Sequence, residues 1–78
     1  MKINISDIKI ILQEVFINSD IPENVQDLKL GDFEEWDSLG NFNFLLAVEN
    51  FFDIRFELDE IGEIKSVQDV ISHLNNSK

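Results

Sequence analysis

Hydrophobic residues recur every three or four positions in three segments of the chain, and this spacing predicts amphipathic helices. The first segment covers residues 4–17, the second covers residues 38–53, and the last begins at Ser66. One further turn of helix is expected over residues 58–61, ended by Gly62. No segment alternates apolar and polar residues as a strand does. The pattern therefore predicts an all-α fold, a small bundle of three main helices plus one short helix.

The stretch between the first two helices has no sustained period and is rich in turn-forming residues. Its isolated apolar residues are expected to hold a long loop against the core: Ile21, Val25, Leu28, Leu30 and Phe33. Unstructured connections of this length are uncommon in small domains and are often functional. Trp36, at the end of the loop, is expected to be a packing anchor that holds the chain beside Ser38.

The second helix carries two separate apolar arcs when its residues are placed at about 100° per step. The wider arc is the expected core face and comprises Phe44, Leu45, Val48, Phe52 and, at its margin, Phe51. The other arc consists of Leu39, Phe42 and Leu46, with Glu49 and Asp53 beside it. A helix packed against one layer needs only one apolar face, so the second arc predicts a docking surface bordered by acids. The alternative is that the preceding loop covers this arc.

The start of the second helix holds the residue with the most distinctive chemistry. Asp37 and Ser38 are both preferred N-cap residues, because their side-chain oxygens accept backbone N–H groups of the first turn. Ser38 is expected at the exposed tip, where a modifying enzyme can reach the hydroxyl and an attached phosphate would face the helix dipole. The alternative for Ser38 is a simple N-cap. No histidine lies near it in sequence to act as a base, so it is not expected to be a catalytic nucleophile.

Composition and charge limit the partners of the chain. It has 16 acidic and 6 basic residues, a formal net charge of −10, which argues against nucleic acid and favours basic protein surfaces. Its 78 residues are expected to form one domain, 1–78, with residues 74–78 frayed. The sequence contains no cysteine, which excludes disulfides and thiolate metal sites. With no signal-like segment and no apolar run near the ~20 residues of a membrane span, we expect a cytoplasmic monomer without membrane insertion.

Two other groups of residues are expected to have structural roles only. His73 is the single histidine and lies near a helix end, where it can interact with the dipole; no metal site is expected there. The acidic residues after the second helix are expected to be a solvated face without the ligand spacing of a calcium loop: Glu57, Asp59, Glu60 and Glu63.

The stretch Trp36-Asp37-Ser38-Leu39-Gly40 resembles the Asp-Ser-Leu attachment motif of acyl carrier proteins. The motif stands at a helix start in the middle of an acidic chain and is followed by Ala-hydrophobic-Glu-x-x-Phe, from Ala47 to Phe52. The resemblance covers nearly the whole chain. The variant with Trp before and Gly after the motif is similar to free-standing carriers of specialised pathways.

The resemblance implies a carrier and not an enzyme. Ser38 would hold a 4′-phosphopantetheine arm taken from coenzyme A, and the arm would carry acyl or aminoacyl groups as thioesters between enzymes of a lipid or specialised-metabolite pathway. Asp37 would help the transferase to engage, with a magnesium ion that belongs to the transferase complex; the carrier itself is expected to hold no metal. The family's fold also has a long loop between its first two helices.

The partners implied by the resemblance are a phosphopantetheinyl transferase, an acyl-activating ligase or acyltransferase, and downstream synthase enzymes with basic surfaces. The expected partner-binding residues are Leu39, Phe42, Leu46, Glu49 and Asp53, and Glu34 and Glu35 are further acids that could pair with such surfaces. The chain departs from the fatty-acid carrier pattern at Gly40, Asn43, Asn50 and Phe51. Recognition by housekeeping fatty-acid enzymes is therefore not implied.

Two questions stay open at the level of sequence. Either part of the cargo folds back into a crevice between the helices, or bulky phenylalanine side chains close that space. The candidate lining residues are Phe44, Leu45, Phe52, Phe56 and Ile64. The cargo itself is open between fatty acyl, aminoacyl, D-alanyl and glycerate-derived groups. The alternative function is a non-covalent acidic helical adaptor that docks another protein through Leu39, Phe42 and Leu46.

Overall fold

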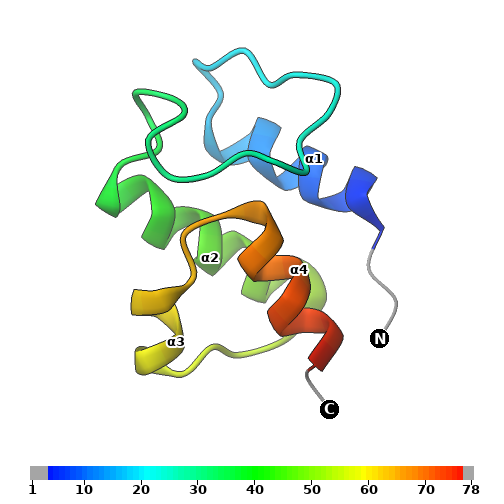
Figure 1. Cartoon of the computed structure of the whole chain (residues 1–78), viewed down its shortest axis with the longest axis vertical. Helices are drawn as coiled ribbons and strands as arrows, with labels where there is room; N and C mark the ends of the chain where they lie inside the picture. Colours follow the sequence, from blue (N-terminus) through cyan, green and yellow to red (C-terminus); the bar gives the residue numbers. More distant parts are fainter. Residues whose placement is uncertain (1–3, 77–78) are drawn as a thin grey trace.

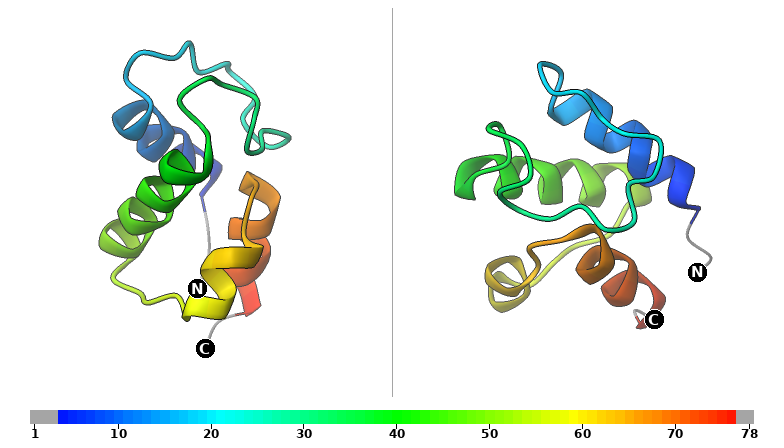
Figure 2. Two further views of the ribbon diagram at one scale, coloured as in Figure 1. Left: turned by 90° about the vertical axis from the view of Figure 1, so that its left-hand side faces the viewer. Right: turned by 45° about the horizontal axis from the view of Figure 1, so that its top comes forward.

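The computed structural model describes residues 4–76. This part of the chain forms four α-helices joined by loops and contains no strand. Helix α1 spans Ile5–Val15, α2 spans Ser38–Phe52, α3 spans Leu58–Glu63 and α4 spans Val67–Asn76. The predicted all-α bundle, with three main helices, one short helix and a long loop after the first, is confirmed. Helix α2 lies between α1 on one side and α3 and α4 on the other (Figure 1, and Figure 2, right).

The core is built from the apolar faces that the helical period predicts. Helices α1, α2 and α4 contribute most of the fully buried side chains: Ile8, Ile11, Leu12, Phe44, Leu45, Val48, Val67, Val70 and Leu74. Burial of such a side chain contributes about 1.5–3 kcal/mol, so these faces hold the helices together. Phe52 is half-buried against this core. Phe51 is 46% exposed, so its placement at the core margin was wrong.

The loop between α1 and α2 arches across one side of the bundle (Figure 1) and is tied down along its length. Val25 is buried, and the other apolar loop residues pack partly buried against the core, as predicted. Farther along, the Leu30 N–H donates to the Lys65 carbonyl at 2.8 Å, and the Val67 N–H donates to the Leu28 carbonyl at 3.0 Å. These two bonds fix the loop to Lys65, in the connection between α3 and α4, and to Val67, the first residue of α4.

The helix ends differ from the sequence predictions in two places. Helix α3 continues through Gly62 to Glu63, so the expectation that Gly62 ends it was wrong. Helix α4 extends through Asn76, into the stretch 74–78 for which we expected fraying, while residues 77 and 78 lie outside the described residues. The Ser66 hydroxyl accepts from the Asp69 N–H at 3.0 Å, as a cap should. The Asp69 carboxylate instead accepts from the Lys65 N–H at 3.1 Å, so the predicted capping box is shifted by one residue.

Candidate functional site around Ser38

Asp37, and not Ser38, caps helix α2. The Asp37 Oδ1 atom accepts from the Gly40 N–H at 2.8 Å, and the Asp37 carbonyl accepts from the Asn41 N–H at 2.8 Å. Ser38 is the first residue of the helix and is exposed. Within residues 4–76 its hydroxyl makes no hydrogen bond, so the reading of Ser38 as a simple N-cap was wrong.

Trp36 fixes the chain immediately before this helix start. Its side chain is 1% exposed. The indole stacks on Phe16 and Phe33, at centroid distances of 5.3 Å and 6.2 Å, and meets Phe44 edge-on at 5.4 Å. Aromatic pairs of this kind add about 0.5–1.5 kcal/mol each beyond the area they bury. The predicted role of Trp36 as a packing anchor is confirmed.

Two buried hydrogen bonds, which we call the buried relay, connect Trp36 through Asn41 to Ile64 across the first turn of α2. The Trp36 Nε1–H donates to Asn41 Oδ1 at 2.9 Å, and Asn41 Nδ2 donates to the Ile64 carbonyl at 2.7 Å. Asn41 is only 6% exposed, and both ends of its amide are satisfied, as a buried polar group requires. The relay therefore joins the loop, the start of α2 and the connection between α3 and α4. Sequence reasoning missed Asn41; the available signal was the need of a buried indole N–H for an acceptor.

Gly40 allows the loop to pass close to α2. A β-carbon at this position would collide with the Glu35 carbonyl oxygen and lie 3.2 Å from the Phe16 ring. The Glu35 carboxylate is also engaged, because its Oε1 atom accepts from the Asn18 N–H at 3.1 Å and from the Ser19 hydroxyl at 2.7 Å. Glu35 thus holds the loop to the end of α1 through Oε1, and its pairing with a basic partner stays a prediction.

The second apolar arc of α2 is open to solvent. We call Leu39, Phe42 and Leu46 the apolar patch; they are 69%, 42% and 40% exposed. The alternative that the preceding loop covers this arc is therefore wrong. The arc lies on the same helix as the Ser38 hydroxyl and begins one residue after it.

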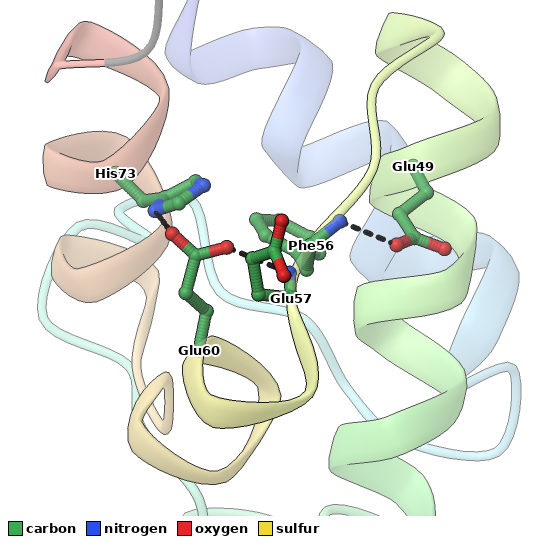
Figure 3. A network of polar contacts seen from close by, with 5 residues as sticks. All are labelled: Glu49, Phe56, Glu57, Glu60 and His73. Carbon is green, nitrogen blue, oxygen red and sulfur yellow. Dashed lines mark hydrogen bonds and ion pairs between the residues drawn. The ribbon is translucent and has the colours of Figure 1, made fainter.

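The two acids predicted to border the apolar patch differ in their availability. Asp53 is exposed and forms the C-cap of α2 with φ of 55° in the left-handed region. Glu49 is half-buried, and its Oε2 atom accepts from the Phe56 N–H at 2.7 Å (Figure 3). Glu49 therefore folds the chain back after α2, which is a structural role that the sequence did not indicate.

Ser38 is one of the residues that line a surface hollow of about 250 Å³. The hollow is lined by residues of the loop, α2, α3 and the connection after α3: Leu30, Asn41, Phe42, Ile61, Gly62 and Lys65. None of these is a predicted crevice residue. Of the predicted crevice residues, Phe44, Leu45, Phe56 and Ile64 are buried in the core and Phe52 is half-buried.

His73, Glu60 of α3 and the N-cap residue Glu57 form a polar network away from Ser38 (Figure 3). His73 Nδ1 lies 3.2 Å from Glu60 Oε2, and its ring packs against Phe56 at a centroid distance of 4.9 Å. Glu60 Oε1 accepts from the Glu57 N–H at 2.7 Å, which closes a capping box at the start of α3. Glu57, Asp59 and Glu63 are exposed, as expected for a solvated face, whereas Glu60 is half-buried.

Residues 4–76 contain no group of three His, Cys, Asp or Glu side chains placed to hold a metal ion. None of the helices within this range is both long and apolar enough to cross a bilayer.

Comparisons with protein-family models, curated proteins and solved structures find no match for this chain. The site itself therefore provides the grounds for assigning a function. Those grounds are an exposed serine hydroxyl at a fixed helix start, an exposed apolar patch on the same helix, and a hollow beside the serine.

Proposed function

We propose that the protein is an acyl carrier protein whose Ser38 is the attachment site of a 4′-phosphopantetheine arm. The observation that carries the proposal is the Ser38 hydroxyl, which is exposed and unbonded because Asp37 takes the capping role. Attachment needs an oxygen that a transferase can approach and a helix start that stays formed when the serine is modified. The Trp36 anchor and the Asp37 cap supply the second condition without using Ser38.

Loading is a phosphoryl-group transfer catalysed by the transferase. The Ser38 oxygen attacks the coenzyme A phosphorus that bears pantetheine, the bond from this phosphorus to the second phosphate breaks, and adenosine 3′,5′-bisphosphate leaves. The serine proton passes to a base of the transferase or to solvent. The phosphodiester formed sits beside the first N–H groups of α2, where the helix dipole favours an anion. Asp37 Oδ1 is occupied by the Gly40 N–H, so its other oxygen is the atom available to a transferase-bound magnesium ion.

The carrier contributes a tether and a docking surface, and its partners contribute the chemistry. An acyl-activating ligase or acyltransferase would load the thiol of the arm as a thioester, and synthase enzymes would use it. Tethering raises the effective concentration of the cargo at each active site visited. The apolar patch is the anchor we assign to these partners, with the net charge of −10 steering the chain toward basic surfaces.

The chain is not proposed to be an enzyme. A serine nucleophile needs an organised base within hydrogen-bond reach. His73 pairs with Glu60 on the α3–α4 side, and the Ser38 hydroxyl has no hydrogen-bond partner within residues 4–76.

The test is the intact mass of the protein after incubation with coenzyme A and a broad-specificity transferase. The wild type and the Ser72→Ala control, which changes an exposed serine of α4, should each gain one phosphopantetheine group. Ser38→Ala should gain none. An unmodified wild type, in a reaction that loads a known carrier, would contradict the proposal.

The second candidate function is a non-covalent adaptor, and the exposure of the apolar patch is the observation that favours it. An adaptor would bind its partner equally well as wild type and as Ser38→Ala, and would lose binding with Leu39→Ser or Phe42→Ser. A carrier would lose its product-forming role with either kind of change, because loading and docking are both required.

A further inference from the structure

Asn41, in the first turn of α2, is the single polar residue among the buried side chains of residues 4–75. Burial of an amide is unfavourable unless its donor and its acceptor are both bonded. In Asn41 both are bonded, the acceptor to Trp36 and the donor to Ile64. A fully bonded polar group in a core fixes one arrangement of the segments that it joins. Asn41 therefore determines how the loop, the start of α2 and the connection after α3 lie relative to one another.

The segment that leads into Ser38 is held by Asn41 at two points. The Asn41 N–H donates to the Asp37 carbonyl at 2.8 Å, and Asn41 Oδ1 accepts from the Trp36 Nε1–H at 2.9 Å. Trp36 and Asp37 are the two residues that directly precede Ser38. Neither bond uses the serine hydroxyl. Asn41 therefore fixes the backbone beside Ser38 while the serine itself stays exposed.

The buried relay is part of a closed ring of hydrogen bonds. The relay ends at the Ile64 carbonyl, and the next carbonyl along the chain, that of Lys65, accepts from the Leu30 N–H at 2.8 Å. The N–H of the residue after Leu30 donates to the Trp36 carbonyl at 2.9 Å, and the Trp36 indole returns to Asn41. The other members of this ring are joined by backbone groups or by the indole. Asn41 is thus the one side chain through which α2 enters the ring.

We propose that Asn41 is a positioning residue for Ser38 in the loading reaction. This inference rests on the function proposed above. The serine oxygen has to approach the coenzyme A phosphorus in line with the bond that breaks. Within residues 4–76 no hydrogen bond holds the Ser38 side chain, so the place of its oxygen is set by the backbone. Asn41 holds that backbone through Trp36 and Asp37 and supplies no group to the reacting atoms.

The test is the steady-state rate of loading, followed by intact mass at saturating coenzyme A while the carrier concentration is varied. Asn41→Leu is similar in size but neither donates nor accepts a hydrogen bond from its side chain. It should lower the kcat of the transferase by about ten- to hundredfold, because a misplacement of about 1 Å can cost this much. Its KM for the carrier should stay within about twofold of the wild type, because the apolar patch is unchanged.

The indole of Trp36 reports whether the relay is broken. The chain has a single tryptophan, so the indole N–H gives one NMR signal. In Asn41→Leu this signal should shift and should exchange with solvent faster, because its acceptor at 2.9 Å is gone. The same spectrum shows whether the variant is folded.

Two controls separate positioning from a general loss of stability. Asn50→Leu changes an exposed asparagine of α2 and should load like the wild type. Val70→Ala shortens a buried side chain of α4 and should lower the Tm while leaving the loading kcat unchanged. A Val70→Ala variant that loses as much kcat as Asn41→Leu would overturn the inference, because stability alone would then explain the effect.

Trp36→Phe is the second variant, and it decides the question if Asn41→Leu does not fold. It keeps an aromatic ring at this position and removes the N–H that donates to Asn41. Its loading kcat should fall by about three- to tenfold, less than in Asn41→Leu because the bond to Ile64 remains. An unchanged kcat in a folded variant, or a raised KM with an unchanged kcat, would overturn the inference.

These failures differ from failure of the proposed function. If the wild type gains one phosphopantetheine group and both relay variants load at its rate, Ser38 is the attachment site and Asn41 does not position it. If the wild type gains no mass in a reaction that loads a known carrier, the carrier function itself is refuted.

Discussion

The two ends of helix α2 are held by different kinds of interaction. At the start, Trp36 is buried among aromatic rings and bonded to Asn41, and the loop backbone passes directly over Gly40. After the end, the chain returns through side-chain bonds to backbone from Glu49 and Glu60, and α3 contains no buried residue.

This difference indicates which end of α2 contributes more to the stability of the fold. Aromatic packing and a satisfied buried relay stabilise the end that presents Ser38. The α3 segment, which forms one wall of the hollow, has no buried residue of its own, and the chain is anchored beside it by Phe56 and Ile64. We therefore expect changes at the start of α2 to affect the free energy of unfolding more than changes after its end.

The largest effect is expected for Trp36→Ala. Removing a buried large aromatic side chain costs about 3–5 kcal/mol, and here it also leaves Asn41 without its donor. The control is Phe51→Ala, which changes an aromatic residue near the C-terminal end of α2. Phe51 is 46% exposed, so its removal should cost less than about 1 kcal/mol. Urea denaturation of both variants measures the difference, and equal losses would remove the contrast between the two ends.

Two glycines give the next comparison. Gly40→Ala should destabilise the protein by about 1–3 kcal/mol, because the added carbon collides with the Glu35 carbonyl oxygen. Gly62→Ala meets no atom within 4 Å and lies inside α3, so it should be neutral or stabilise by up to about 1 kcal/mol. Thermal unfolding measured by circular dichroism would give opposite shifts in Tm; a stabilised Gly40→Ala would contradict the close approach of the loop.

Glu49→Ala tests the turn after α2. Loss of its bond to the Phe56 N–H at 2.7 Å should cost about 1 kcal/mol. The control is Glu14→Ala, an exposed acid of α1, which should change stability by less than about 0.5 kcal/mol. If both variants unfold at the same denaturant concentration, the bond from the Phe56 N–H to Glu49 does not stabilise the turn.

The smallest effect is expected for the contact between Glu60 and His73. A double-mutant cycle with Glu60→Gln and His73→Gln should give a coupling energy of about 0–1 kcal/mol, because both side chains are partly exposed. A coupling as large as the loss in Trp36→Ala would mean that α3 is held as firmly as the start of α2.

Local periodicity was sufficient to predict the helices and the two faces of α2. The spacing of Phe44, Leu45 and Val48 indicated the core face, and the isolated position of Leu39 and Phe42 indicated a face without an internal partner. These features depend on residues three or four apart, so they can be obtained without knowing the tertiary fold.

Features that depend on distant contacts were not predicted. Asn41 bonds to Ile64, 23 residues away, and nothing near Asn41 in sequence indicates that partner. The choice of Asp37 over Ser38 as the cap also depends on the path of the loop, because both residues cap equally well in local terms. The missing β-carbon of Gly62 indicates a helix end, yet α3 continues through it, since a glycine permits a turn without requiring one.

The proposed attachment of the arm to the Ser38 oxygen can be examined by fragmentation mass spectrometry of the protein after reaction with coenzyme A and a transferase. We expect the added phosphopantetheine on the peptide that contains Trp36 and Ser38, and on that serine alone. Addition at Ser66 or Ser72, or no addition while a known carrier is loaded in the same tube, would contradict it.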